Sequence, residues 1–296
     1  GNVMAFQIEQ QVTSIEDGWS VGHFCTTRLH ISRKMLVSIK HHGDILRNEQ
    51  HVNVNEPVHA GDRIHVRFPE EQPAQDMHAT SGELDILFED DWLLIVNKPP
   101  GMASIPSRLH PERSLSNFVL GYYRQHQIPY AIHIVNRLDR DTSGLVVFAK
   151  HSLAHHQLSK MQQNGLLDRR YVALIEGTIP AQTIDLPIGQ TDHSFMERMV
   201  REDGQQAITH ILTSEPITAF SRELSRLTIK LETGRTHQIR VHLAALGHPL
   251  VGDTMYKGTP LIARQALHSA SATFPHPGTG EVMTFVAPLP DDLCLS

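Results

Sequence analysis

The sequence predicts an α+β protein with a small amino-terminal part and a larger carboxy-terminal part. Its 296 residues are enough for one or two domains. Strand-like apolar runs and segments with helical spacing both occur along the chain. Residues 69–83 are acidic, contain proline and have few apolar side chains, as is typical of a linker. We therefore predict domains at residues 1–70 and 84–296, joined by a linker at 71–83.

The amino-terminal part combines strand and helix signals. A strand is predicted around residues 6–12, and apolar positions within residues 27–40 recur at helical spacing, with Ser32 placed to cap a helix. Turn and strand signals follow, including a Gly-Asp turn that opens residues 61–67. Together these segments predict a small α+β module.

The larger part is predicted to mix helices with strands. Ser114 is placed to cap the first of its helices, and Gly165 and Gly247 to end the other two. The helices are predicted at residues 114–126, 152–164 and 236–246. Strands are predicted on either side of an acidic turn within residues 86–98, and at 171–175 and 224–231. Residues 185–210 have few apolar positions and predict an extended excursion.

Residues 134–150 hold the densest group of charges between apolar runs. The runs 131–135 and 145–149 read as strands, and Arg137, Asp139, Arg140 and Asp141 lie between them. The small polar residues 142–144 then permit a sharp turn. A charged turn at the ends of two strands is a common place for catalytic residues, although an aspartate here could equally close an Asx turn.

Arg240 is predicted to be a partly buried cation that needs an anionic partner. On the predicted helix 236–246 it shares a face with Leu243 and Ala244, which places its guanidinium beside apolar side chains. A buried guanidinium needs an anion. Asp139 is the carboxylate that we predict to pair with it.

Composition narrows the class of protein. The formal net charge of −6 argues against a nucleic-acid partner for the chain as a whole. However, residues 28–67, 137–170 and 222–257 are each basic on balance, and 69–91 contain only acidic charges. This distribution allows an RNA-binding face on an acidic protein.

Several further classes are disfavoured by the sequence. The two cysteines lack metal-binding spacing, and His151 and His155, although four residues apart, have no third ligand, so they are predicted to lie on a solvated helix face. No metal site is predicted. No apolar run approaches membrane-spanning length and no signal peptide is evident, so we expect a cytoplasmic protein without a membrane partner, and a monomer.

Four ordered segments carry a family resemblance. They are VNKPPG at residues 96–101, the segment at 134–150, DRRYVALIEG at 168–177 and ETGRTHQIRVHLAALGHPLVGD at 232–253. Together they resemble the pseudouridine synthases that modify ribosomal and transfer RNA, typified by the ribosomal large-subunit synthases. The resemblance runs from about residue 84 to 288. It implies a mixed, mostly antiparallel catalytic sheet with flanking helices, and an isomerase that needs no cofactor.

The resemblance also implies roles for individual residues. Asp139 corresponds to the catalytic aspartate, Arg240 to its ion-pair partner and Tyr171 to the residue that stacks on the flipped base. Asn136 departs from the family, which commonly has histidine there, so a proton-transfer role at that position is in doubt. The residues expected to contact RNA are Arg137, Arg140, Lys98, Arg235 and His237, with Arg33, Lys34 and Lys40 of the amino-terminal part.

The amino-terminal part is similar to a small RNA-binding module first known from a ribosomal small-subunit protein. It therefore favours large-subunit ribosomal RNA as the substrate, with transfer RNA as the alternative. A ribosome-associated RNA-binding protein without catalysis is a further alternative, against which the intact Asp139, Tyr171 and Arg240 count. A metal-dependent hydrolase is disfavoured because no HExxH segment occurs.

Overall fold

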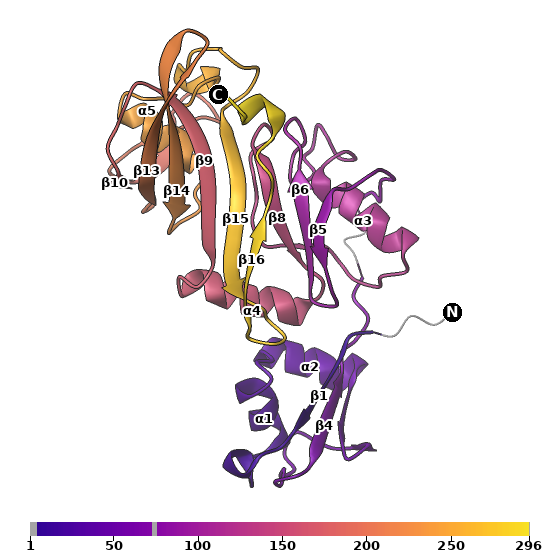
Figure 1. Ribbon diagram of the computed structural model, residues 1–296. Helices are drawn as coiled ribbons and strands as arrows, with labels where there is room; N and C mark the ends of the chain where they lie inside the picture. The colour runs from indigo at the N-terminus through magenta and orange to yellow at the C-terminus, as the bar shows by residue number, and fades with distance from the viewer. Residues whose placement is uncertain (1–4, 73–75, 296) are drawn as a thin grey trace.

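A computed structural model describes residues 5–72 and 76–295 of the chain. It contains a four-stranded sheet, a ten-stranded sheet and a small two-stranded sheet. Figure 1 shows the four-stranded sheet and its helices at one end of the large sheet, below helix α4. Across the described ranges, the longest and most apolar helices fall short of what a membrane crossing requires.

The amino-terminal module is a sheet covered by two helices. Its elements are β1 (Gln7–Gln11), η1 (Ser14–Glu16), α1 (Val21–Thr27), α2 (Arg33–His42), β2 (Asp44–Arg47), β3 (Gln50–His51) and β4 (Arg63–Arg67). The strand order is β1-β4-β2-β3, with every pair antiparallel. The predicted cap is confirmed, since Ser32 Oγ accepts a hydrogen bond from the Met35 amide at 3.1 Å. Helix α1 was not predicted.

The module packs directly against the larger part of the chain. The Phe6 ring stacks on His151 at 3.6 Å between centroids and meets Trp92 edge-on at 4.9 Å. Leu153 of helix α4 joins the same apolar cluster. The prediction that His151 lies on a solvated face is therefore wrong: its ring is 2% exposed, and Nδ1 caps the helix by accepting from the Ala154 amide.

The predicted linker also contacts the larger part. A Glu71 carboxylate oxygen accepts from the Ser152 amide at 2.7 Å, and the other lies 2.7 Å from His133 Nε2. Further along, the Thr80 amide donates to the Asn117 carbonyl at 3.1 Å. Glu71 and Thr80 of this segment thus bind the larger part of the chain. The composition of the segment had predicted a linker and none of these contacts.

The large sheet is mixed and mostly antiparallel, as predicted. Its strands are β5 (Ile86–Glu89), β6 (Leu93–Lys98), β7 (His133–Ile134), β8 (Ser143–Ala149), β9 (Asp168–Glu176), β10 (Gln182–Asp185), β13 (Ile208–Ala219), β14 (Arg222–Leu231), β15 (Leu267–Pro275) and β16 (Val282–Val286). The main order is β10-β13-β14-β9-β15-β8-β6-β5, with β16 beside β15 and β7 beside β8. Among these described strands, the parallel pair is β8 with β15.

Helices cover both faces of this sheet. They are α3 (Leu115–Gln125), α4 (Ser152–Gln163) and α5 (Gln238–Ala245), with short turns η2 (Thr254–Tyr256) and η3 (Asp291–Leu293). Leu94 and Val96 of β6 pack with α3, while their neighbours Leu93 and Ile95 pack on the face that α4 covers. This alternation follows from the two-residue period of a strand, and it explains why β6 is apolar on both sides.

Helix α5 is shorter than the predicted span 236–246. His237 adopts a left-handed backbone with φ of 57°, so regular helix begins only at Gln238. The Gln238 side chain bonds back to the preceding loop, accepting from the Thr233 hydroxyl at 2.7 Å and the Arg235 amide at 3.0 Å. These contacts fix the loop that leads into the helix.

The register of three central strands brings distant segments together. Tyr171 of β9 lies opposite Ser269 of β15, which in turn lies beside Gly144 of β8. A side chain at Gly144 would come within 2.2 Å of the Ser269 carbonyl oxygen, and its φ of +121° also favours glycine. The loop just before β8 therefore lies close to Tyr171.

The excursion predicted at 185–210 contains a small hairpin. Strands β11 (Ile188–Gln190) and β12 (Arg198–Val200) pair antiparallel, and their connecting loop exposes Phe195. The hairpin leaves the edge strand β10 and returns to β13.

Candidate active site

Asp139 lies in a tight turn between β7 and β8. The Thr142 amide donates to the Asp139 carbonyl at 3.0 Å, closing the turn that residues 142–144 predict. Asn136 fixes the start of this loop, since its side chain donates to the Leu145 carbonyl and accepts from the Val147 amide. Asn136 therefore binds the backbone of β8 through its side-chain amide. It does so at the position where the family that the sequence resembles commonly has histidine.

Lys98 also stabilises the loop that contains Asp139. Its ammonium donates to the carbonyl oxygens of Pro99, Met102 and Arg140 at 2.7–3.0 Å, and the side chain is fully buried. The prediction that Lys98 contacts RNA is therefore wrong, because its donors are turned inward. Burial lowers the pKa of Lys98 to about 7, against the opposing charges of Asp139 and Asp141.

Arg264 holds the loop from the other side. Its guanidinium donates to the Asp141 carbonyl at 2.9 Å and to Ser143 Oγ at 3.0 Å, and it forms an ion pair with Asp292 at 2.7 Å. Sequence reasoning missed this residue. Nothing in the sequence pattern indicated it, because the contact depends on the parallel pairing of β8 and β15.

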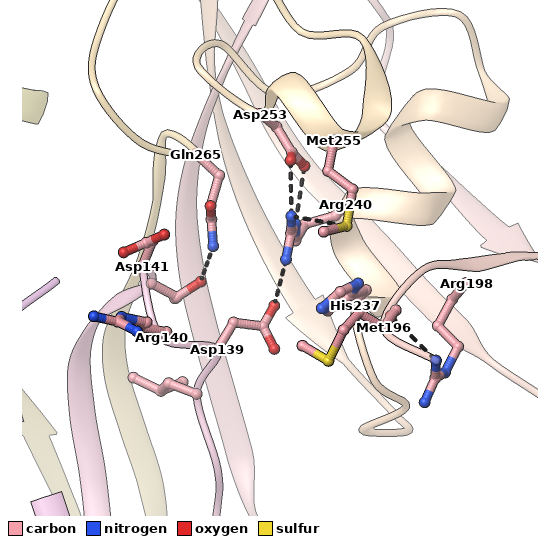
Figure 2. A network of polar contacts seen from close by, with 12 residues as sticks. Asp139, Arg140, Asp141, Met196, Arg198, His237, Arg240, Asp253, Met255 and Gln265 are labelled. Atoms are coloured by element: carbon pink, nitrogen blue, oxygen red, sulfur yellow. Dashed lines mark hydrogen bonds and ion pairs between the residues drawn. The ribbon is translucent and has the colours of Figure 1, made fainter. Parts of the chain in front are cut away.

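Arg240 of α5 is shared by two carboxylates. It binds Asp253 through two hydrogen bonds of 2.9 Å and Asp139 through one contact of 3.3 Å (Figure 2). The predicted pairing with Asp139 is present, but Asp253, which lies at the end of the quoted segment 232–253, is the stronger partner. Burial would lower the pKa of Arg240, yet the hydrogen bonds and charges of Asp253 and Asp139 outweigh it and raise the pKa.

His237 and Tyr256 extend this network toward the hairpin. His237 Nδ1 lies 2.7 Å from the Tyr256 hydroxyl, which also accepts from the Arg198 amide at 2.9 Å. The Arg240 guanidinium lies over the Tyr256 ring at 5.1 Å. Burial lowers the pKa of His237; the Asp139 charge opposes this shift and the Arg240 charge adds to it. The neutral imidazole is thus favoured near pH 7, which leaves Arg240 as the cation next to Asp139.

Asp139, His237 and Arg240 line one open cleft of about 1960 Å³. Tyr171 lies in its wall and is 4% exposed. Among the residues of the described chain that line it, seven are arginines and two are aspartates, and neither lysine nor glutamate occurs. The charged residues are Arg108, Arg113, Arg137, Asp139, Arg140, Asp141, Arg169, Arg235 and Arg240. A cleft of this size and positive charge suits a polyanion better than a small ligand.

The predicted RNA-contact residues fall into two groups. Arg137 and Arg140 are exposed at the cleft, and Arg235 lines it while donating to the Gln206 carbonyl at 2.8 Å. His237 is buried but also lines the cleft. The remaining three, Arg33, Lys34 and Lys40, are exposed on α2 of the amino-terminal module and do not line the cleft.

Fold and cleft both point to one class of protein. A family model described as RNA pseudouridylate synthase matches residues 92–245. The chain therefore belongs to the RNA pseudouridylate synthase family, whose members are isomerases that act on RNA. The resemblance drawn from the four sequence segments is confirmed.

Individual relatives agree with this assignment. The chain is 46% identical over 269 residues to the RNA pseudouridine synthase YjbO of Bacillus subtilis, covering 90% of this chain and 94% of the relative. It is 40% identical over 227 residues to ribosomal large subunit pseudouridine synthase D of Vibrio cholerae, covering 71% and 68%. In fold, it is similar to human RNA pseudouridylate synthase domain containing 1, with a TM-score of 0.58, 24% identity and coverage of 75% and 89%.

Proposed function

We propose that this chain converts uridine to pseudouridine in large-subunit ribosomal RNA, with Asp139 as the catalytic residue. One observation carries the proposal. The Asp139 side chain is 28% exposed in an arginine-lined cleft, and lies 3.3 Å from an arginine whose other side is occupied by Asp253. The Asp139 carboxylate is thus held by Arg240 while part of it remains accessible to a substrate in the cleft.

The reaction fits a site of this kind. The bond between ribose C1′ and uracil N1 must break, the base must turn, and C1′ must bond to C5 of the same base. The proton on C5 is then lost and N1 gains one, so the product is an isomer of uridine. A positioned carboxylate can act as the nucleophile or assist departure of the base, and no redox carrier is required.

Tyr171 and the arginines have supporting roles in this proposal. A uridine inside structured RNA must leave its stack, at a cost of a few kcal/mol. Stacking on the Tyr171 ring would return roughly 1–3 kcal/mol of that cost. The exposed Arg137, two residues before Asp139, is placed to fill the vacated stack or to hold a phosphate.

The substrate assignment rests on two considerations. Relatives that this chain matches at 38–40% identity bear the name ribosomal large subunit pseudouridine synthase D. The exposed cations on α2, Arg33, Lys34 and Lys40, supply a second basic surface suited to a large RNA. Transfer RNA is the alternative substrate. A monomeric state, a cytoplasmic location and the domain bounds 1–70 and 84–296 remain predictions.

Pseudouridine mapping of total RNA tests the proposal. A strain lacking this protein is complemented with wild type, with Asp139→Asn or with an empty vector. We expect a site in large-subunit ribosomal RNA to disappear in the deletion and to return only with wild type. Loss of a site in transfer RNA would overturn the substrate assignment alone. Restoration by Asp139→Asn would overturn the role of Asp139.

A further inference from the structure

Arg169 is a buried cation that the proposed mechanism does not use. It lies on β9 two residues before Tyr171, and strand periodicity places both side chains on one face, where both line the cleft. Arg169 is 7% exposed, so its side chain is more than nine-tenths buried.

Its surroundings differ from those of the other buried arginines of the cleft region. Arg240 and Arg264 each bind a carboxylate through two nitrogens. Within residues 5–72 and 76–295, the Arg169 guanidinium makes no hydrogen bond or ion pair with a side chain or a carbonyl. Its nitrogens are not among the fully buried unpartnered atoms of the described residues, so they are open to the cleft although most of the side chain is buried. The site therefore lacks a negative partner that a ligand could supply.

The guanidinium is also held in a defined direction. It lies along the backbone at Gly234, where an added Cβ would sit 3.1 Å from Arg169 Nη2. Gly234 belongs to the loop that leads into α5 and hence to Arg240. Arg169 is therefore confined between the face of β9 and this loop, with its free side toward the cleft.

We propose that Arg169 binds a backbone phosphate of the RNA, next to the uridine whose base stacks on Tyr171. Residues two apart on a strand are separated by about 6.6 Å, a span comparable to the ribose between a base and its phosphate. A guanidinium fork matches two phosphate oxygens, which makes arginine well suited to such a contact. This inference rests on the proposed function, because it takes the substrate to be RNA.

Arg170 provides a matched control. It follows Arg169 on the same strand but points to the other face, is exposed, and pairs with Asp168 at 3.3 Å. Arg169→Gln and Arg170→Gln therefore remove the same charge at adjacent positions. Arg169→Lys keeps the charge and loses the fork. Thermal unfolding of each variant establishes that it is folded.

The first test is the salt dependence of RNA binding. All variants are made in the Asp139→Asn background, and binding of a fluorescein-labelled oligouridylate is followed by anisotropy at increasing KCl. Each phosphate contact to a single strand contributes about 0.7 to the slope of log affinity against log salt. We expect Arg169→Gln to lower that slope by about 0.7, and Arg169→Lys and Arg170→Gln to preserve it. An unchanged slope for Arg169→Gln would overturn the inference.

The second test uses turnover with Asp139 intact. On a transcript of large-subunit ribosomal RNA, Arg169→Gln is expected to raise KM by ~10-fold with kcat little changed, as for a contact made equally in ground and transition states. If wild type neither binds nor modifies RNA, the proposed function itself fails. If wild type does both and Arg169→Gln behaves like Arg170→Gln, only the assignment of Arg169 fails.

Discussion

Two aspartates on opposite sides of Arg240 differ in what their surroundings allow. Asp253 is 1% exposed and binds the guanidinium through both of its oxygens, whereas Asp139 is 28% exposed and makes one longer contact (Figure 2). A buried bidentate pair fixes the arginine in place. The looser pair leaves Asp139 with an oxygen that a substrate can reach. Asp253 thus fixes the position of Arg240, and Arg240 in turn contacts Asp139.

The largest expected effect tests the Asp139 side. Asp139→Asn keeps the shape of the side chain and removes its charge, so we expect pseudouridine formation to fall by ~10³-fold or more. Stability should change by less than about 1 kcal/mol, because the pair is partly exposed. Activity assays on a ribosomal RNA transcript and thermal unfolding check both parts. A large loss of stability would mean that Asp139 has a structural role as well.

The opposite pattern is expected on the Asp253 side. Asp253→Asn leaves the buried Arg240 without its main counter-charge, and breaking a buried pair in this way costs about 3–5 kcal/mol. Denaturant unfolding measures the change. If Asp253→Asn is no more destabilising than Asp139→Asn, the two carboxylates are equivalent and the comparison is wrong.

Lys98, which lies beneath the Asp139 loop, predicts a pH effect. Its pKa is lowered from 10.5 to about 7 in the folded chain, chiefly by burial. Between pH 7 and pH 10.5, Lys98 keeps its proton in the unfolded chain and has lost it in the folded chain. The free energy of unfolding therefore rises with pH across this window. We expect the stability of wild type relative to Lys98→Met to rise from pH 7 to 10.5. A curve for wild type relative to Lys98→Met that stays flat across this window would contradict the prediction.

The smallest effect is expected at Asp141, the other aspartate of the cleft. Its backbone carbonyl is held by Arg264, and its carboxylate makes no hydrogen bond or ion pair among the described residues. Asp141→Asn should therefore change kcat/KM by no more than about 3-fold, because no direct partner of the carboxylate is lost. A loss comparable to that of Asp139→Asn would show that the cleft depends on its total negative charge.

Local structure followed closely from the sequence. Ser32 and Ser114 cap helices where predicted, since a hydroxyl before a helical segment can accept from the amide three residues on. Helix α3 matches its predicted span to within one residue at each end. The amino-terminal helix α1 escaped prediction because its seven residues are too short for a clear helical period.

The sequence by itself determined the apolar runs that become strands, the charged turn at Asp139 and the family to which the chain belongs. The tertiary structure decided which long side chains are buried and what they contact. Lys98 and His151 proved to be buried, and Asp253, Arg264 and Arg169 emerged as parts of the site. The physical reason is that these contacts join segments far apart in the chain, such as Arg264 and Asp141, which are 123 residues apart. A local pattern fixes the period of a strand, but the strand order fixes its neighbours.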